Sequence, residues 1–321
     1  MQRSLIFKII AGFAILLFVG WLLWNIGLNT YDANEPITAS PENYSLNSGN
    51  STRFAVIGDF GDSGQPEADV AALVDSWNVD FIVTVGDNNY PDGEASTIDT
   101  NIGQYYQAYI HPYKGIFGSG STENRFFPAM GNHDWYPGHI QPDLDYFTPP
   151  GNERYYDFER GPVHFFILDS DLHEPDGRRR DSVQAVWLEH NLVPSEAPWQ
   201  LVFLHHPPIA STLEREKDCE MQWPYARWGA DAVIAGHDHL YKRLPYNGIP
   251  YFVNGLGGRS SSINPTHRFG VPIPGSQTRY NRDYGAMLVI ADEACINFSF
   301  HNRIGEIIDS HTINIELIPE S

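Results

Sequence analysis

The stretch Gly86-Asp87-Asn88-Asn89-Tyr90 decides how the rest of the chain is interpreted. It follows the apolar run Phe81-Ile82-Val83-Thr84-Val85 and precedes Pro91-Asp92-Gly93, so the pattern predicts a buried strand that ends in a loop. Folding alone requires neither a carboxylate nor a phenol at this point of the chain. Both groups can ligate a metal ion, which makes this strand end a candidate for chemistry.

Four further apolar segments end in residues that can bind metals. They are Gly58-Asp59-Phe60-Gly61, Gly131-Asn132-His133-Asp134, Val202-Phe203-Leu204-His205 and Gly236-His237-Asp238-His239. We expect the fold to bring all five strand ends together around two metal ions, with Asp87 between them. Two ions a few ångströms apart can activate water and hold a phosphoryl group for in-line displacement.

The composition indicates a globular domain whose main partner is neither nucleic acid nor anionic lipid. Of 321 residues, 42% are hydrophobic and 13% aromatic, which is ample for a packed core, and the formal charge is -20. Cys219 and Cys295 are far apart and match no CxxC pattern. We expect two unpaired thiols, with a single disulfide as the alternative.

The first fifty residues predict attachment to a membrane. Residues 9–28 are apolar apart from Asn25, follow Arg3 and Lys8, and are numerous enough to cross a hydrocarbon core. We therefore expect a transmembrane anchor in residues 1–28, a flexible linker in residues 29–50 and the catalytic domain in residues 51–321, on the extracytoplasmic (periplasmic or extracellular) side. A cleaved signal peptide, and hence secretion, is the alternative.

The folded part begins with a predicted strand-helix-strand unit. A strand over residues 54–57 is followed by a helix that starts at Pro66, and then by the strand that leads to Asp87. Such a unit has parallel strands and a right-handed crossover, so Asp59 and Asp87 should emerge at the same sheet edge, where ligands bind in open α/β sheets.

Later segments predict two more helices, further strands and a long loop. Residues 93–122 predict a helix followed by a loop, with Tyr105, Tyr106 and Tyr109 expected in the core. Asp181 or Ser182 should cap a helix with one apolar face, made of Val183, Val186, Trp187 and Leu192. Residues 255–284 predict a loop whose start, Gly255-Leu256-Gly257-Gly258-Arg259, we interpret as a mobile rim in preference to a phosphate cradle.

At the five strand ends the sequence resembles the purple acid phosphatases within the calcineurin-like metallophosphoesterases. That family's blocks run GDxG, GDxxY, GNH[DE], VxxH and GHxH, and all five occur here in this order. The resemblance implies an α/β fold, a four-layer αββα sandwich of two mixed sheets flanked by helices. It also implies two overlapping ligand sets: Asp59, Asp87, Tyr90 and His239 for a ferric ion, and Asp87, Asn132, His205 and His237 for a divalent Fe, Zn or Mn ion.

One departure from the wider superfamily supports this branch. Ordinary metallophosphoesterases usually carry a histidine two residues after the first aspartate, where this chain has Gly61. Tyr90 would replace the missing ligand, since a phenolate is a hard anionic donor suited to Fe(III). Tyrosinate-to-ferric charge transfer gives that family its purple colour.

The resemblance also implies the reaction. His133 would contact the phosphoryl group or protonate the leaving oxygen, with Asp134 orienting its ring, while a metal-bound hydroxide hydrolyses a small phosphate monoester. Hydrolysis of phosphodiesters or nucleotides at the same site is one alternative, and a membrane-tethered metal-binding module without catalysis is another. His206 could be a phosphate contact or a packed neighbour, and the pattern leaves both open.

Overall fold

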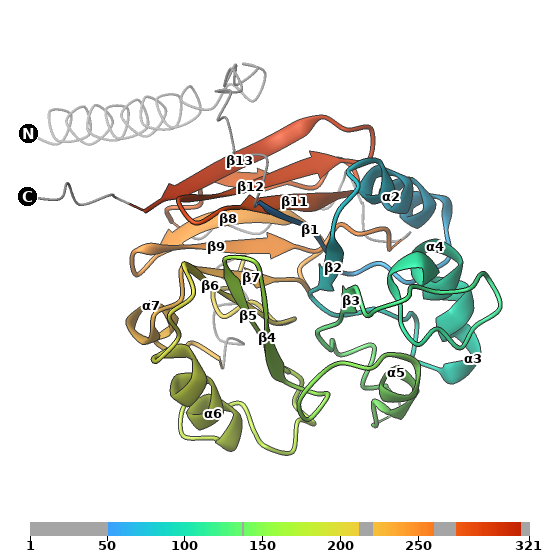
Figure 1. Ribbon diagram of the computed structural model, residues 1–321, viewed down its shortest axis with the longest axis horizontal. Coiled ribbons are helices and arrows are strands. Elements are labelled where there is room, and N and C mark those ends of the chain that lie inside the picture. Colours follow the sequence, from blue (N-terminus) through green and yellow to red (C-terminus); the bar gives the residue numbers. More distant parts are fainter. Residues whose placement is uncertain (1–50, 137, 212–220, 260–273, 316–321) are drawn as a thin grey trace, which may run out of the picture. The chain divides into compact units, whose positions relative to one another are not determined.

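Two mixed β-sheets pack face to face in the computed structural model, which describes residues 51–136, 138–211, 221–259 and 274–315 (Figure 1). The first sheet has the order β13-β12-β11-β1-β2-β3, from β1 (Thr52–Ile57), β2 (Phe81–Thr84), β3 (Phe126–Phe127), β11 (Gly285–Ala291), β12 (Cys295–Asn302) and β13 (Ile307–Asn314). The second has the order β10-β8-β9-β7-β6-β5-β4, from β4 (Tyr156–Arg160), β5 (Val163–Ile167), β6 (Trp199–Phe203), β7 (Ala232–Ala235), β8 (Tyr241–Tyr246), β9 (Ile249–Asn254) and β10 (Thr278–Tyr280).

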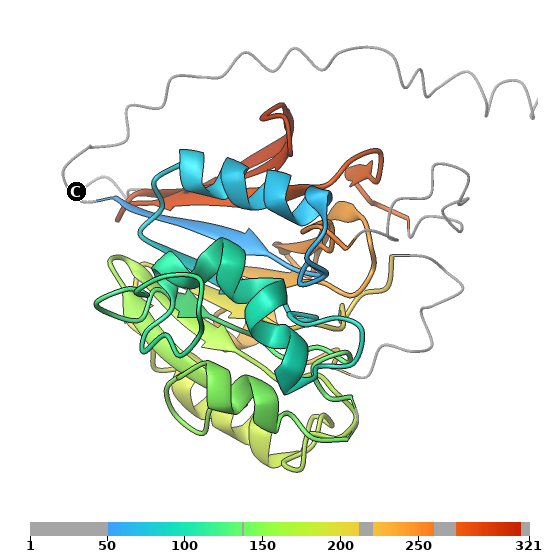
Figure 2. The same ribbon diagram turned by 90° about the vertical axis from the view of Figure 1, so that its right-hand side faces the viewer.

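Helices cover the outer face of each sheet. They are α2 (Gln65–Ser76), α3 (Ala95–Ile98), the π-helical turn η1 (Asp99–Gly103), α4 (Gln104–Tyr106), the 3₁₀ turn η2 (Gln107–Tyr109), α5 (Gln141–Tyr146), α6 (Val183–Leu192) and α7 (Tyr225–Trp228). Figure 2 shows α2 and the segment from α3 to α4 lying along the first sheet, and α6 and α7 pack on the second. The expected four-layer αββα arrangement is therefore present.

The alternation of side chains along the strands builds these layers. In β1, Phe54 and Val56 enter the core between the two sheets, whereas Ala55 and Ile57 enter the core beneath α2. Successive residues of a strand point to opposite faces, so a fully apolar strand serves both cores at once. The apolar run Phe54–Ile57 is thus explained by its central position in the first sheet.

Parallel pairing brings the predicted strand ends to one edge. β1 pairs in parallel with β2, and β5, β6, β7 and β9 form a parallel set in the second sheet. The carboxyl ends of β1, β2, β6 and β7 lead into Asp59, Asp87, His205 and His237. The predicted βαβ unit is confirmed, and the two sheets together supply the loops of one site.

The predicted face of α6 is correct for Leu192 and for Trp187, which packs against the core, but wrong for the two valines. Ser182 caps the helix as expected, accepting a hydrogen bond from the Ala185 amide at 3.2 Å. Val183 and Val186, however, are 61% and 59% exposed, and the buried face consists of Gln184, Ala185, Leu188 and Leu192. Gln184 sets this rotation, because its side chain exchanges two hydrogen bonds of 2.9 Å with the backbone of Asp169.

The segment 93–122 is less regular than expected. The predicted helix is present as an unbroken run of helical residues from Ala95 to Tyr109, which contains the π-helical turn η1 and ends in the 3₁₀ turn η2. Tyr106 and Tyr109 are buried in the core as predicted. In the part of the chain given above, no helix is both long and apolar enough to cross a membrane. The predicted anchor (1–28), the linker (29–50) and Cys219 lie outside the described residues, and Cys295 is a free thiol.

Candidate metal centre

Three of the predicted ligands occupy unusual backbone positions. Asp59, Asp87 and His237 each follow a strand and have φ values of 55°, 54° and 66°. Residues other than glycine seldom adopt this left-handed conformation, and such strain is concentrated at functional sites. Here it lets the chain turn sharply after the strand, so that the side chains of neighbouring loops converge.

One group of donor atoms gathers around Asp59 and Tyr90. The Tyr90 hydroxyl lies 2.8 Å from Asp87 Oδ2, 3.4 Å from Asp59 Oδ1 and 3.4 Å from His239 Nε2. His239 Nε2 is 3.2 Å from Asp59 Oδ1. These four side chains are the set that the sequence assigned to the ferric ion.

A second group gathers on the other oxygen of Asp87. His205 Nε2 lies 3.2 Å from Asp87 Oδ1 and 3.2 Å from Asn132 Oδ1, and His237 Nδ1 is 3.1 Å from the same Asn132 oxygen. These four side chains are the set assigned to the divalent ion. Asp87 belongs to both groups and presents one carboxylate oxygen to each.

The chemistry of these donors fits a cation. The Val85 carbonyl oxygen accepts from His205 Nδ1 at 2.8 Å, so the ring proton is on Nδ1 and the Nε2 lone pair is directed at the oxygens of Asp87 and Asn132. Lone pairs that converge in this way repel one another unless a positive charge lies between them. Backbone support of the second ring nitrogen is also the usual way in which proteins orient a histidine ligand.

Electrostatics at Asp87 point the same way. Burial alone would raise the pKa of Asp87, but His205 and His133 lower it to well below its ordinary value. Burial would lower the pKa of His205, yet Asp87 raises it above its ordinary value. The site therefore binds positive charge strongly, whether as a proton on His205 or as a metal ion that replaces it.

Tyr90 is a phenol that needs a cation before it can ionise. Burial, together with Asp59 and Asp87, raises its pKa well above the usual value. The guanidinium of Arg259 lies 3.8 Å from the centre of its ring and acts in the opposite direction. A strongly charged ion is what would turn this phenol into a phenolate ligand.

Gly61 leaves no room for a side chain at the position where ordinary metallophosphoesterases carry a histidine. A Cβ atom at position 61 would lie 1.7 Å from the carbonyl oxygen of Asn88, so no side chain fits there. The Gly61 carbonyl oxygen accepts a hydrogen bond of 2.8 Å from the Tyr90 amide. The absence of a ligand at position 61 and the placement of Tyr90 are therefore two results of one close backbone contact.

The segment Gly255–Arg259 is part of the site, which corrects its interpretation as a mobile rim. Gly255 to Gly258 are buried. The Gly257 amide donates to the Gly58 carbonyl oxygen at 2.8 Å, and the Arg259 amide donates to the Asp59 carbonyl oxygen at 3.0 Å. These bonds brace the turn that carries Asp59, and glycine is required at position 257, where a Cβ atom would lie 2.4 Å from the Gly58 carbonyl oxygen.

His133 lies at the border of the two donor groups. Its amide donates to Asp87 Oδ1 at 2.9 Å, and its ring centre is 4.4 Å from that of Tyr90 and 5.8 Å from that of the exposed Tyr136. Its Nδ1 is hydrogen-bonded to the Pro91 carbonyl oxygen, which leaves Nε2 for a substrate. The side chain is half-buried, so part of the ring is accessible from solvent.

Asp134 has a different set of partners from the one expected. Its carboxylate accepts from the amides of Gly131, Asn88 and Asn89 at 2.7, 2.8 and 3.1 Å, and from the Asn88 side chain at 3.0 Å. The ring of His133 is oriented by Pro91 instead. Asp134 thus ties the loop after β2 to the loop after β3.

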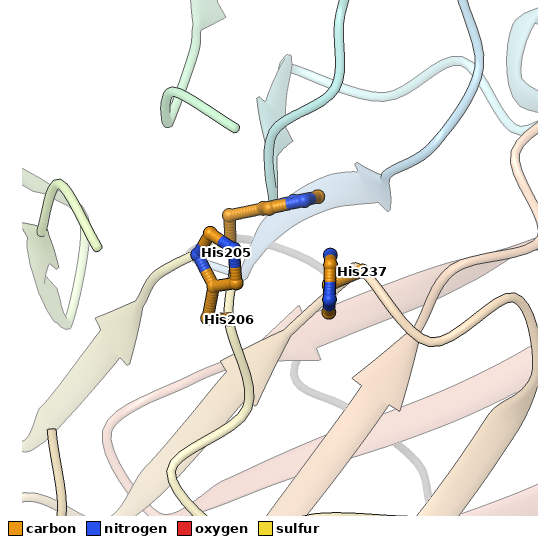
Figure 3. A group of neighbouring side chains, drawn as sticks. All are labelled: His205, His206 and His237. Atoms are coloured by element: carbon orange, nitrogen blue, oxygen red, sulfur yellow. The ribbon is translucent and has the colours of Figure 1, made fainter. Parts of the chain in front are cut away.

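Two further residues support the site and were missed in the sequence. Asn101, in η1, donates to the Tyr90 carbonyl oxygen at 2.7 Å and to Asn89 Oδ1 at 2.9 Å. Ser170, after β5, is hydrogen-bonded to His206. Neither residue stands in a recognisable motif, although β5 ends in polar residues as the ligand-bearing strands do. Figure 3 shows His206 beside His205 and near His237.

Comparisons with known proteins agree with this geometry. Residues 52–241 match the family model described as calcineurin-like phosphoesterase. Purple acid phosphatase 17 of Arabidopsis thaliana is 25% identical over 306 residues, covering 84% of this chain and 87% of that protein. Human tartrate-resistant acid phosphatase type 5 is 24% identical over 269 residues, covering 71% and 79%.

Solved structures share the fold. Plasmodium GAP50, described as the anchor in the inner membrane complex, superposes with a TM-score of 0.62 at 18% identity, covering 84% of this chain and 90% of that one. PhoD superposes with a TM-score of 0.55 at 11% identity, covering 83% and 68%. The family match spans more than half of the chain and includes all five strand ends. The chain therefore belongs to the calcineurin-like phosphoesterase family, as a metallophosphoesterase hydrolase similar to the purple acid phosphatases.

Proposed function

We propose that this protein hydrolyses small phosphate monoesters with a dinuclear centre that contains Fe(III) and a divalent Fe, Zn or Mn ion. The observation that carries the proposal is the division of the donor atoms into two groups that share Asp87. When bound, the two ions supply an activated water nucleophile and neutralise charge on the phosphoryl oxygens. Asp59, Tyr90 and His239 would hold the ferric ion, and Asn132, His205 and His237 the divalent one.

His133 would assist the departure of the alcohol. With Nδ1–H bonded to the Pro91 carbonyl oxygen, the imidazolium form carries its second proton on Nε2, where the leaving oxygen can take it. The backbone amide of His133 is bonded to Asp87, so the ring keeps a fixed distance from the shared carboxylate. Asp134 would act as a positioning residue for both loops.

Phosphodiesters and nucleotides are the alternative substrates within the same chemistry, because the motifs do not specify the loops around the site. We further propose that residues 1–28 anchor the domain on the extracytoplasmic side of a membrane. Recovery of the full chain in the membrane fraction, with the domain accessible to protease from the outer side only, would support this placement. Release of activity into the soluble fraction by carbonate washing would count against it.

The visible absorption spectrum tests the ferric assignment. We expect the purified protein to show a broad charge-transfer band that is absent from Tyr90→Phe, because the phenylalanine ring has no oxygen to donate to Fe(III). Tyr106→Phe is the matched control, since Tyr106 is also a buried phenol but lies in the core beneath the helices.

Three results would contradict parts of the proposal. A band that persists in Tyr90→Phe would remove Tyr90 from the ligand set. A colourless protein that binds Zn or Mn and hydrolyses monoesters would exclude Fe(III) while retaining the dinuclear hydrolase. Faster hydrolysis of bis(p-nitrophenyl) phosphate than of p-nitrophenyl phosphate would replace the monoesterase by a diesterase.

A further inference from the structure

Ser170 holds the imidazole of His206 in one orientation. Ser170 is 1% exposed, and its hydroxyl oxygen accepts the backbone N–H of His206 at 2.8 Å. The same oxygen lies 3.0 Å from His206 Nδ1. The backbone and the ring of His206 are thus both fixed by a single buried hydroxyl group.

The hydrogen atoms of this pair determine the tautomer. A serine hydroxyl has one proton to donate, and a buried hydroxyl that finds no acceptor for it destabilises the folded protein. Within the described part of the chain, the acceptor in reach of that proton is His206 Nδ1. Nδ1 is therefore unprotonated, and the proton of the neutral imidazole is on Nε2.

The Nε2–H group lies next to the proposed divalent site. The ring centre of His206 is 4.9 Å from that of His205 and 4.4 Å from that of His237. One ring nitrogen of each of the three histidines lies within 4.8 Å of those of the other two. Figure 3 shows one ring nitrogen of His206 on the side of His237 and the other on the far side.

A protonated nitrogen in this place suits an anion better than a metal. To ligate an ion, Nε2 would have to lose its proton to Nδ1, and the hydroxyl of Ser170 would then have no acceptor. A neutral N–H donor that is rigidly held beside a divalent ion is well placed to bind a phosphoryl oxygen, as preorganised donors do in oxyanion sites.

We propose that His206 donates a hydrogen bond from Nε2–H to a non-bridging oxygen of the bound phosphoryl group, in the substrate and in the product phosphate. Ser170 is the positioning residue that keeps the proton on Nε2. The inference rests on the proposed function, because it places a phosphoryl group at the metal centre. It decides between the two roles for His206 that the sequence left open.

The experiment compares the wild-type protein with His206→Ala, His206→Gln and Ser170→Ala, and with His190→Ala on the exposed side of α6 as the matched control. Metal content is measured by mass spectrometry, the dissociation constant of inorganic phosphate by calorimetry, and kcat and KM with p-nitrophenyl phosphate. Circular dichroism and the Tm show whether each variant is folded.

We expect His206→Ala to keep two metal ions and to bind phosphate about 10- to 100-fold more weakly, the effect of losing one hydrogen bond to a charged group. His206→Gln, whose amide still donates, should recover part of that affinity. Ser170→Ala should weaken phosphate binding about 3- to 10-fold with full metal content, because the proton is no longer held on Nε2. His190→Ala should match the wild type.

Two outcomes overturn the inference. If His206→Ala, or the gentler His206→Gln, loses one metal ion, then His206 is a ligand. If His206→Ala and His206→Gln both bind phosphate as tightly as the wild type, then His206 is a packed neighbour. The proposed function can fail separately. If the His206 variants bind phosphate more weakly than the wild type, but the wild type hydrolyses no ester, then the proposed reaction is contradicted and the phosphate contact is retained.

Discussion

A side chain at position 61 would meet the Asn88 carbonyl oxygen, because a Cβ atom there would lie only 1.7 Å from it. Since backbone atoms cannot rotate away, Gly61→Ala must displace the loop that carries Tyr90. We expect a loss of about 3 kcal/mol or more in the free energy of unfolding, together with loss of the visible band. Chemical denaturation and the absorption spectrum measure the two effects.

Gly248→Ala separates this contact from ordinary backbone strain. Gly248 has a φ of 91° with open space around its Cβ position, so an alanine there costs about 1 to 2 kcal/mol and touches nothing. Its band should be unchanged. If Gly61→Ala behaves like Gly248→Ala, the proposed link between position 61 and Tyr90 does not hold.

The role of His133 is also decided at the scale of one side chain. His133→Ala should retain both metal ions and lose about 100-fold or more in kcat for p-nitrophenyl phosphate, because a general acid contributes that much. The loss should be smaller for esters whose alcohols leave readily without a proton. A fall in metal content that parallels the fall in activity would show that His133 supports the metals rather than the leaving group.

At the scale of single residues, the sequence predicted which side chains lie close together. It predicted fewer of the hydrogen bonds that each of them makes. The resemblance carried by the five blocks predicted the seven side chains that the fold brings together around Asp87. It did not predict that Pro91 orients His133 or that Asp134 binds three amides, since these contacts depend on how two loops pack. A carboxylate next to a histidine in sequence can point to the other side of the turn.

Among the elements, the π-helical turn η1 has the clearest consequence for the site. Its Asn101 is 6% exposed and donates to the Tyr90 carbonyl oxygen and to Asn89 Oδ1. A π-helical turn inserts one extra residue into a helix and often occurs at functional sites. Here it presents Asn101 to the loop that carries the proposed tyrosinate.

Asn101→Leu tests this support. The leucine side chain has a similar volume and no donor, so the carbonyl of Tyr90 and the amide oxygen of Asn89 would each lose the hydrogen bond that Asn101 donates. We expect a loss of about 2 kcal/mol in stability and a shifted or weakened visible band, with metal still bound. Asn191→Leu is the control, since its side chain donates to the Trp187 carbonyl oxygen on α6, away from the site. An unshifted band in Asn101→Leu would show that η1 does not position Tyr90.

The same scale shows where hydrophobic periodicity fails. Val183 and Val186 fall at helical spacing and yet face solvent, because Gln184 is buried by its bonds to the Asp169 backbone. A buried glutamine carries no hydrophobic signal, so the sequence pattern could not place Gln184 on the buried face and assigned the two valines to it instead. Where burial was almost wholly apolar, as in β1 and β2, the predicted segments agree with the observed strands to within two residues at either end.

Across the whole molecule, each sheet has the same hydrogen-bonding arrangement at the strand ends opposite the metal centre. In this arrangement, which we call a corner, an aspartate before one strand bonds to the backbone of the neighbouring strand. Asp80, before β2, exchanges two hydrogen bonds of 2.8 Å with the backbone of Arg53. Asp231, before β7, does the same with Gln200, at 2.7 and 2.8 Å. Asp80 is exposed, whereas Asp231 is half-buried. Sequence patterns could not show this equivalence, which appears only when both sheets are assembled.

The difference in burial predicts how stability depends on pH. Burial raises the pKa of Asp231 to about 6, against an ordinary value of 3.8, although the Gln200 amide partly opposes the change. Below pH 3.8 the carboxyl is protonated in both the folded and the unfolded state, so it does not lower the free energy of unfolding. As the pH rises from 3.8 to about 6, the unfolded chain releases the proton first, so stability is lost, and the full cost persists above pH 6.

Asp231→Asn should therefore stabilise the protein at a pH of about 7.5 and not at about 4. The amide oxygen of asparagine can still accept from Gln200, so the variant removes the charge and keeps the corner. We expect a gain of about 1 to 2 kcal/mol at the higher pH, after allowance for partial exposure. Asp80→Asn alters the equivalent exposed corner and is the matched control. Urea denaturation of all three proteins at both values of pH, with metal content held constant, measures the effect. An equal change in both variants would mean that burial does not distinguish the two corners.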